Sequence, residues 1–442
     1  MTAHRRSRRK NKFRHRVSTR LQNPSIWQCL GPGLITGAAD DDPSGIATYS
    51  QTGAKLGLET LWTLWLTYPL MVAMQYVSAL IGRVTGAGLA QNIRQRYPAP
   101  VLYAIIVALF VANTINLGAD IGAMGEAVRL LVGGHALVWS VAIAVVALIL
   151  IVAMSFHSYA RLLKYLTLSL FAYAAVLFFA HIGWKDVARA VVWPHVQWSN
   201  DYLTAIVAIF GTTISPYLFF WQASHEVEEQ KHARNEQPLK RAPQQAHAQL
   251  RRVRVDTLVG MAVSNIVAFC IMLTGASVLH AHGITDVDSA SQAAKALEPV
   301  AGHWSFILFA LGILGTGMLA IPTLAGSAAY AVAETFKWPR GLNKHLFQAS
   351  GFYAIIAIGT LLGVLLNAFE FNPMTALYWS AVINGIVAVP LMVIIMLLSG
   401  STAVMGKFTA SRKLKWGGWL ATVVMGLAAL AMIASWFHSG TS

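Results

Sequence analysis

The segment GPGLITGAADDDPSG, residues 31–45, interrupts the first hydrophobic stretch of the chain with three aspartates and a proline. A second segment, GTTISPY at residues 211–217, interrupts a later hydrophobic stretch at its middle. Proline lacks an amide donor and disfavours helical geometry in the preceding residue, so we expect a helix to stop near Asp42 and again near Ser215. Bare carbonyls at such breaks are tolerated within a membrane only where they face a cavity or a bound ion.

The composition predicts an all-α membrane protein. Of the 442 residues, 56% are hydrophobic and only 12% are charged, whereas roughly 25% of a soluble domain is charged. Runs of about 18 or more nearly uncharged residues are long enough to cross a hydrocarbon core. We predict eleven spans: 29–53, 60–82, 101–131, 136–156, 162–182, 202–222, 257–279, 304–330, 348–366, 374–398 and 416–437.

The two interrupted spans are the first and the sixth. Because they are five spans apart, and five is an odd number, the two halves of the chain must cross the membrane in opposite senses. Interrupted helices at corresponding positions of two inverted halves indicate a transporter whose binding site lies at the breaks. The predicted organisation is a basic tail (1–28), a first five-helix repeat (29–182), an extracellular loop (183–201), a second five-helix repeat (202–398) containing a cytoplasmic loop (225–256), and a loop with the eleventh helix (399–442).

The distribution of positive charge predicts the orientation. Of the 33 Lys and Arg, 28 lie in six segments that the eleven spans place on one side of the membrane, which is the positive-inside pattern. We therefore expect a multi-pass protein of the cytoplasmic membrane with a cytoplasmic N-terminus and an external C-terminus. The net charge of +15 then indicates contact with the lipid bilayer and requires no nucleic acid. The six segments are 1–20, 83–96, 161–164, 231–254, 337–344 and 407–415.

Three consecutive aspartates within a spanning helix need compensation, because each costs about 2.5 to 3.5 kcal/mol at the centre of a helix on insertion scales. The span interiors contain scarcely any Lys or Arg that might pair with them. Only Asp42 lies at the break, so we expect its carboxylate to contact the substrate. We expect Asp40 and Asp41 to support it, facing water or a partner side chain.

Other polar residues extend the candidate pathway. Asn113, Asn116 and Asp120 are spaced to lie on one stripe of the third span. Asp120 is expected along the cation path, whereas the asparagines, like Asn384 in the tenth span, fit an interhelical hydrogen bond equally well. The cluster of His and Glu at 225–229 either pairs with the basic segment that follows it or forms an exit vestibule.

The chemistry around the second break predicts a hard cation as the substrate. Carboxylate, hydroxyl and carbonyl oxygens suit Mg²⁺, Mn²⁺ or Ca²⁺, and a site that keeps several waters suits Mg²⁺ in particular. The sequence contains no phosphate-binding loop and no paired-histidine metal helix. We therefore expect no cofactor, no enzyme activity and no ATP-driven step. Four hydroxyls flank Pro216: Thr212, Thr213, Ser215 and Tyr217.

The two breaks together resemble those of the NRAMP family of divalent metal transporters, and more closely its magnesium-transporting branch. The resemblance covers nearly the whole chain. The family motif Asp-Pro-Gly-Asn corresponds to DPSG at 42–45, and the motif Ala-x-x-Met-Pro-His corresponds to TTISPY at 212–217. The resemblance implies a leucine-transporter-like fold and an ion bound by the Asp42 carboxylate, the backbone near Ala39 and Thr212, and the Ser215 side chain.

The departures from the family motifs imply a changed substrate. Ser215 replaces the methionine, a soft ligand that favours Mn²⁺ and Fe²⁺ over hard ions. Gly45 replaces a metal-binding asparagine, which implies a roomier site with fewer protein ligands. Asp120 is the one acid of the family's proton route that is kept. Other positions of that route differ here: Tyr217, Gln222 and Leu117. These changes imply import of Mg²⁺, and also of Mn²⁺, by alternating access without proton coupling.

Several alternatives remain open on the sequence alone. The nearest is a proton-coupled importer of Mn²⁺ or Fe²⁺. An amino-acid carrier of the same fold is disfavoured, because three aspartates would repel the substrate carboxylate. An intramembrane aspartyl protease is disfavoured because the tetrapeptide at 37–40 lacks the second glycine of a Gly-x-Gly-Asp motif. A structural or sensing protein would bind ions without moving them.

Overall fold

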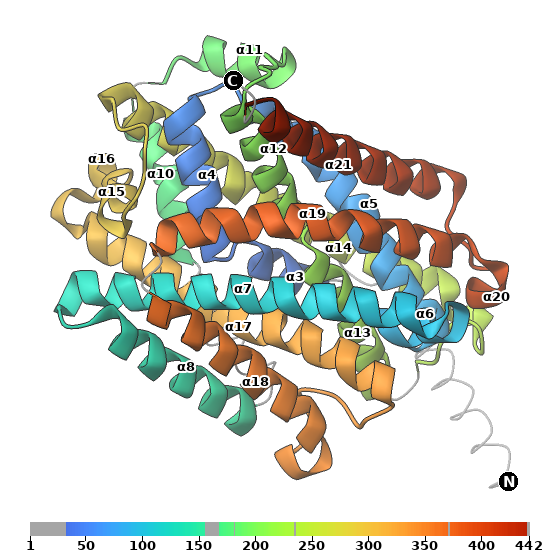
Figure 1. Cartoon of the computed structure of the whole chain (residues 1–442). Coiled ribbons are helices and arrows are strands. Elements are labelled where there is room, and N and C mark those ends of the chain that lie inside the picture. Colours follow the sequence, from blue (N-terminus) through green and yellow to red (C-terminus); the bar gives the residue numbers. More distant parts are fainter. Residues whose placement is uncertain (1–31, 155–167, 181, 234–235, 370–371, 440–442) are drawn as a thin grey trace, which may run out of the picture.

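A computed structural model describes residues 32–154, 168–180, 182–233, 236–369 and 372–439. This part of the chain is helical and contains no strand (Figure 1). Nine of its helical segments are long and apolar enough to cross a membrane. With the interrupted first span and the described part of the fifth, they account for the eleven predicted spans. The predicted tail 1–28 lies outside the described residues, as do residues 162–167, with which the fifth predicted span begins.

The helices follow the predicted spans closely. The first half contains α3 (Pro32–Asp40), α4 (Pro43–Leu56), α5 (Leu61–Thr85), α6 (Leu89–Arg96), α7 (Ala99–Val132), α8 (Ala136–Ala153) and α10 (Phe171–Phe179). The short α11 (Trp184–Val192) leads to α12 (Asn200–Thr213), α13 (Pro216–His232), α14 (Ala246–Thr274), α15 (Ala290–Lys295), α16 (Glu298–Ala301), α17 (Ser305–Phe336), α18 (Ser350–Leu366), α19 (Pro373–Gly400), α20 (Thr402–Met405) and α21 (Arg412–Ser439).

Both predicted helix breaks are confirmed. α3 ends at Asp40 and α4 begins at Pro43, while α12 ends at Thr213 and α13 begins at Pro216. The two broken spans run in opposite directions. The end of α4 lies beside the beginning of α12 at one end of the molecule, which we call the α15 end. The end of α13 lies beside α6 and α20 at the other, which we call the α20 end (Figure 1).

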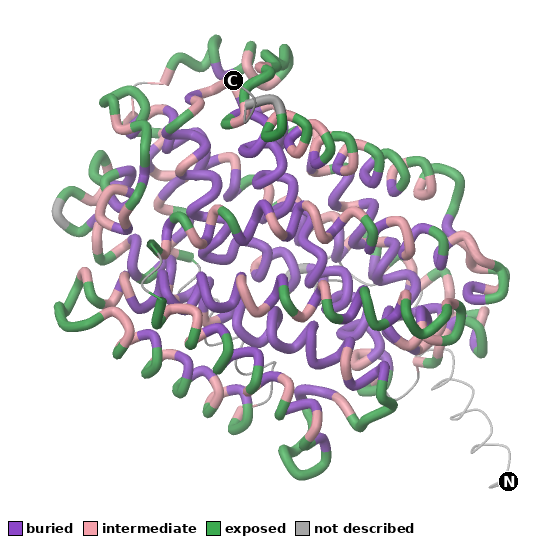
Figure 2. The backbone as a smooth tube through the Cα atoms, in the orientation of Figure 1, coloured by how far each residue is buried: buried purple, intermediate pink, exposed green. Residues whose placement is uncertain are grey.

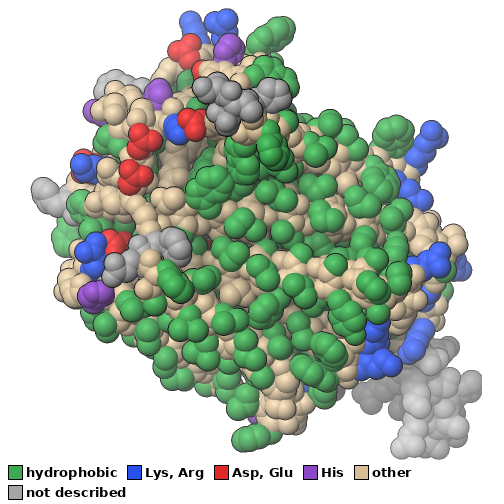
Figure 3. Space-filling view, viewed as in Figure 1, with side chains coloured by type: hydrophobic (Ala, Val, Ile, Leu, Met, Phe, Trp, Pro, Cys, Tyr) green, Lys and Arg blue, Asp and Glu red, His purple; other side chains and the backbone are tan. Residues whose placement is uncertain are grey.

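The broken spans occupy the centre of the molecule. Figure 2 shows a buried interior surrounded by helices with exposed outer faces. The apolar window of Asn200–His232 is buried throughout, whereas less than a third of the windows in α8 and α21 is buried. The exposed faces carry large apolar side chains such as Val141, Ile149 and Leu430. In Figure 3 such side chains form a broad band between the two charged ends, as expected of a surface that contacts lipid.

Two expectations about the segments between helices were wrong. The predicted loop 225–256 is mostly helical, because α13 continues to His232 and α14 already begins at Ala246. Charged side chains in this segment form ion pairs, so the chain can stay helical there. Arg83, expected in a loop at 83–96, lies in the last turn of α5 and its side chain is fully buried.

Candidate functional site

Asp42 ends the first break and caps the helix that follows it. Its Oδ1 accepts hydrogen bonds from the Gly45 amide (2.8 Å) and the Ser44 hydroxyl (2.6 Å). Aspartate is a favoured N-cap and proline a favoured first helical residue, and the carboxylate also lies at the positive end of the α4 dipole. Oδ1 of Asp42 therefore caps α4, and Oδ2 remains for other contacts.

Asp42 Oδ2 and the Ala39 carbonyl converge on one hydroxyl. The Tyr217 hydroxyl, from the first turn of α13, lies 3.2 Å from Asp42 Oδ2 and 3.1 Å from the Ala39 oxygen. Ala39 belongs to the last turn of α3, where carbonyls lack a helical amide partner. A hydroxyl carries a single hydrogen and cannot satisfy both acceptors at once. Two such oxygens directed at one point form an arrangement that suits a cation.

Asn116 connects this point to α7 and α19. Its Nδ2 donates to Asp42 Oδ2 (3.1 Å) and lies 3.4 Å from Asp120 Oδ2. Its Oδ1 accepts from the Ser380 hydroxyl (2.7 Å) and from Asn384 Nδ2 (3.4 Å). The amide is thereby oriented with its donor toward Asp42. Asn113, by contrast, donates to the Leu324 carbonyl and the Ser327 hydroxyl of α17, so it packs two helices together.

The second break supplies oxygens from α12. The Ser215 hydroxyl lies within hydrogen-bonding distance of the Gly211 carbonyl (2.8 Å) and the Thr212 carbonyl (2.7 Å), so it caps the end of that helix. The buried Thr212 hydroxyl has no hydrogen-bond partner among the described residues. A Cβ placed on Gly45 would lie 3.2 Å from this hydroxyl. The Thr212 side chain therefore borders Gly45 on the side where another residue would carry its Cβ.

Four buried carboxylates gather around the breaks without a cationic side chain. They belong to Asp40, Asp41, Asp42 and Asp120, each at most 5% exposed. None of them takes part in an ion pair within the described part of the chain. Asp40 and Asp41 share the hydroxyl of Ser264 on α14, at 2.6 and 3.2 Å. Burying several carboxylates without a counter-charge is costly, so this arrangement is suited to a cation.

The sequence profile of the family described as natural resistance-associated macrophage protein-like, or Nramp, matches residues 33–435. The chain belongs to the Nramp family. Curated relatives include the divalent metal cation transporter MntH of Klebsiella pneumoniae (strain 342), 25% identical over 432 residues that cover 92% of this chain and 96% of that protein. MntH of Verminephrobacter eiseniae (strain EF01-2) is 28% identical, covering 79% of this chain and 80% of the relative.

Solved structures show the same fold. A variant of the Eremococcus coleocola manganese transporter superposes with a TM-score of 0.74 at 18% identity, covering 94% of this chain and 90% of that one. Mhp1, a nucleobase-cation-symport-1 family transporter, gives a TM-score of 0.51 at 16% identity, with 92% of each chain covered. This Nramp protein thus has the leucine-transporter-like fold predicted from its two breaks, and is a multi-pass membrane protein.

Gln222 lies away from the Asp42 site of this Nramp protein. Its Oε1 accepts from the Thr36 hydroxyl of α3 (2.6 Å), and its Nε2 donates to Glu226 (3.0 Å). It therefore links the first half of the broken first span to the acidic cluster at the α20 end. The other predicted residues lie at or beside the breaks, as described above.

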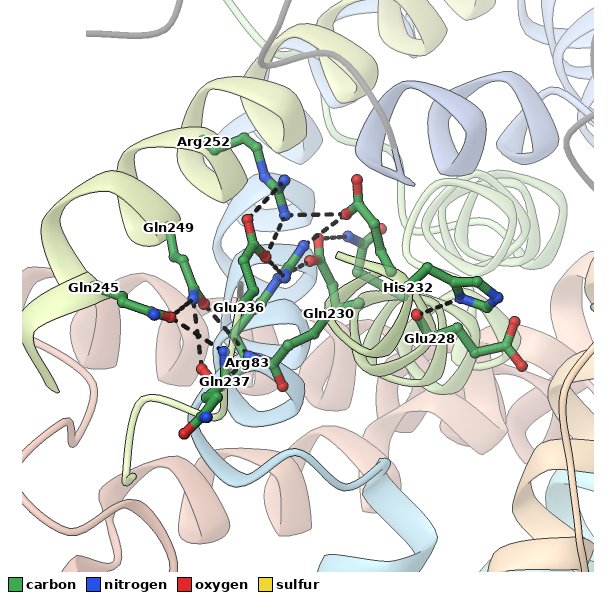
Figure 4. Close-up of polar contacts among 12 residues, drawn as sticks. Arg83, Glu228, Gln230, His232, Glu236, Gln237, Gln245, Gln249 and Arg252 are labelled. Carbon is green, nitrogen blue, oxygen red and sulfur yellow. Dashed lines mark hydrogen bonds and ion pairs between the residues drawn. The ribbon is translucent and has the colours of Figure 1, made fainter. Parts of the chain in front are cut away.

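Two acids of the cluster at 225–229, Glu226 and Glu229, form ion pairs with arginines, which agrees in part with the first of the two readings. Arg83 bonds to Glu226 through Nε, to Glu229 (2.6 Å) and to Glu236 (2.7 Å). Arg252 of α14 adds contacts to Glu229 and Glu236 (Figure 4). Arg252 does belong to the basic segment after the cluster, but the central partner, Arg83, lies far earlier in the chain. These carboxylates consequently join α5, α13 and α14.

Sequence reasoning missed three serines of the site. Ser44 and Ser264 bond to the aspartates, and Ser380 orients Asn116. Ser380 could have been found, because it lies one helical turn before Asn384 on an otherwise apolar span. Ser264 had no such signal, since a single serine in a spanning helix usually bonds to its own backbone.

Proposed function

We propose that this Nramp protein is a secondary transporter that imports divalent cations, with Mg²⁺ preferred and Mn²⁺ accepted. The observation that supports this most directly is the convergence of Ala39 O and Asp42 Oδ2 on the Tyr217 hydroxyl, among four carboxylates that lack a cationic partner. The ion would take the position of that hydroxyl. It would add the Thr212 carbonyl and Ser215 hydroxyl of the second break.

The preference for Mg²⁺ rests on the kind of ligand. The contacts of Asp42 in the described structure are to oxygen and nitrogen groups of Ser44, Gly45, Asn116 and Tyr217. Residue 215, where the family motif carries a thioether, supplies a hydroxyl. Hard oxygen ligands suit Mg²⁺, which also keeps several of its waters. Manganese fits the same donors, which explains why we expect it to be carried as well.

Import needs no coupled proton in this proposal. With the α20 end in the cytoplasm, two positive charges moving inward gain about 4.6 kcal/mol across 100 mV, inside negative. The α20 end shows Lys and Arg without Asp or Glu, whereas the α15 end shows charges of both signs (Figure 3), and this difference supports that orientation. Because the ion binds where both spans are broken, rocking of one bundle against the other would expose it to each side in turn.

The test is uptake into proteoliposomes that contain the purified protein, with dyes for Mg²⁺, Mn²⁺ and pH recorded in parallel. We expect Mg²⁺ to enter under an inside-negative potential without proton movement. Asp42→Ala should abolish this uptake. Normal uptake by Asp42→Ala would refute the assignment of the ion to Asp42.

A second candidate is a proton-coupled importer of Mn²⁺ or Fe²⁺. The manganese transporter of Eremococcus coleocola, with its similar fold, favours it, and Asp120 beside Asn116 offers a carboxyl group close to the ion position. The same experiment separates the two. Entry of Mn²⁺ together with protons, with Mg²⁺ excluded, would establish this candidate and refute the preferred one.

A further inference from the structure

A cavity of about 620 Å³ lies at the α20 end and shares no lining residue with the Asp42 site. Its walls come from the end of α5, from α6, from the end of α13, from the segment 236–241 and from α20. They form three stretches, 85–96, 230–241 and 403–404, which are far apart in the sequence and meet only in the fold. The volume is within the range of about 300 to 1,000 Å³ that is usual for small-molecule sites.

The cavity is strongly positive. Arg96, Lys231, Lys240 and Arg241 line it, and all four are exposed. Among the described residues, no carboxylate lies within ion-pair distance of any of the four. Four such charges around one concave surface repel one another, so an anion that enters the cavity lowers their electrostatic energy.

The acid that lines this cavity does not offset the charge. Glu236 directs one carboxylate oxygen to Arg83 at 2.7 Å and the other to Arg252 at 3.3 Å (Figure 4). Both partners lie outside the lining of the cavity. Glu236 is thereby paired with Arg83 and Arg252, and none of the four cavity cations forms an ion pair in the described part of the chain.

The cationic rim is held in place by the backbone. The amides of Leu239 and Lys240 donate to the carbonyls of Arg83 (3.1 Å) and Val84 (3.2 Å) at the end of α5, and the Arg241 amide donates to Pro238 (2.8 Å). Lys240 also reaches the Ala403 carbonyl of α20 through Nζ (3.3 Å). Lys240 and Arg241 are therefore presented by a segment that is bonded to the helix end.

We propose that this cavity binds a phosphate-bearing anion. Arginine recognises phosphate through paired N–H groups and lysine through its charge, and basic pockets between spanning helices are known to hold anionic headgroups. Two sources share this chemistry, an anionic phospholipid and a soluble polyphosphate. Because Lys231 belongs to α13, whose other end lies at the Ser215 break, a bound anion ties the broken span to α6 and α20.

The test compares two double variants of the full chain. Arg96→Glu with Arg241→Glu reverses charge on two separate walls of the cavity. Arg412→Glu with Lys413→Glu reverses the same number of exposed charges at the start of α21, outside the cavity. Thermal unfolding of both variants checks that they fold. This design does not depend on which ion the protein carries.

Binding is measured in two arms. Native mass spectrometry of protein from nanodiscs of phosphatidylglycerol and phosphatidylcholine counts retained anionic lipid, and calorimetric titration with a nucleoside triphosphate measures the soluble source. We expect the wild type and the α21 variant to bind in at least one arm, and the cavity variant to bind about tenfold or more weakly in that arm. Equal binding by all three proteins, equal loss in both variants, or no binding in either arm would overturn the proposal.

Discussion

Carboxylates are buried both at the junction of α5 with α13 and at the meeting point of the two broken spans. The free-energy cost of burying them is offset in a different way at each place. At the junction, the buried Arg83 bonds to three glutamates at once. Around the breaks, four aspartates are served by hydroxyl and amide donors, with no ion pair in the described structure. A permanent counter-charge suits the junction of α5 with α13, which holds helices together. The absence of a counter-charge at the breaks suits a site that binds and releases a cation.

The largest expected effect is on stability, at the junction of α5 with α13. Arg83→Gln leaves the buried Glu226 without its cation, so it should lower the free energy of unfolding by about 3 to 5 kcal/mol. Chemical unfolding in detergent measures this change. Arg129→Gln is the control, because Arg129 is exposed and its one ion pair among the described residues is with Glu126. This substitution should lower the free energy of unfolding by less than about 1 kcal/mol. Equal stability of the two variants would show that the ion pairs of Arg83 do not stabilise the fold.

Ser215→Met tests whether the side chain of residue 215 determines which ion the site prefers. A thioether near the ion should raise the affinity for Mn²⁺ relative to Mg²⁺ by about tenfold, because sulfur is a soft ligand. Competition between the two ions in the uptake assay gives the ratio, with Ser215→Ala as the control that removes the hydroxyl without adding sulfur. An unchanged ratio would mean that residue 215 does not face the ion.

Tyr217→Phe tests whether the hydroxyl holds the place of the ion. Without it, Ala39 O and Asp42 Oδ2 lose their shared donor in the empty protein, so the empty state becomes less stable by about 1 kcal/mol. Ion binding should then tighten about fivefold, as measured by calorimetric titration. Binding that weakens by the same factor would instead make the hydroxyl a ligand of the bound ion.

Ser380→Ala should have the smallest effect. Ser380 acts through Asn116, whose Oδ1 it holds at 2.7 Å, so its loss should weaken ion binding about twofold. Ser399→Ala is the matched control on the same helix, because the hydroxyl of Ser399 bonds to no described residue other than Met396, whose carbonyl lies within α19. A similar change in both variants would show that the effect comes from α19 itself.

The sequence predicts local features of this fold well. Pro43 and Pro216 determine where the two helices end, because the missing amide acts on the adjacent turn whatever the surroundings. The stripe that contains Asn116 and Asp120 is likewise a property of one helix, and the structure brings both residues toward Asp42. In each case the deciding interaction lies within a few residues of the signal.

Features that depend on packing between distant segments were not predictable in this way. Arg83 and Glu226 are 143 positions apart, and Tyr217 and Ala39 are 178 positions apart. In neither pair does the local sequence around one residue indicate which distant residue it contacts. The closeness of Gly45 to Thr212, which belongs to the opposite repeat, was not predictable for the same reason.

The most direct test of the account is calorimetric titration of Mg²⁺ into the wild type, Asp42→Asn and Glu226→Gln. Asparagine caps a helix as well as aspartate does, so Asp42→Asn keeps the break while removing the charge. We predict that Asp42→Asn weakens Mg²⁺ binding at least about 100-fold, or about 2.7 kcal/mol, and that Glu226→Gln leaves it unchanged. Binding by Asp42→Asn within about twofold of the wild type would show that the Asp42 carboxylate only caps a helix, which would contradict the account.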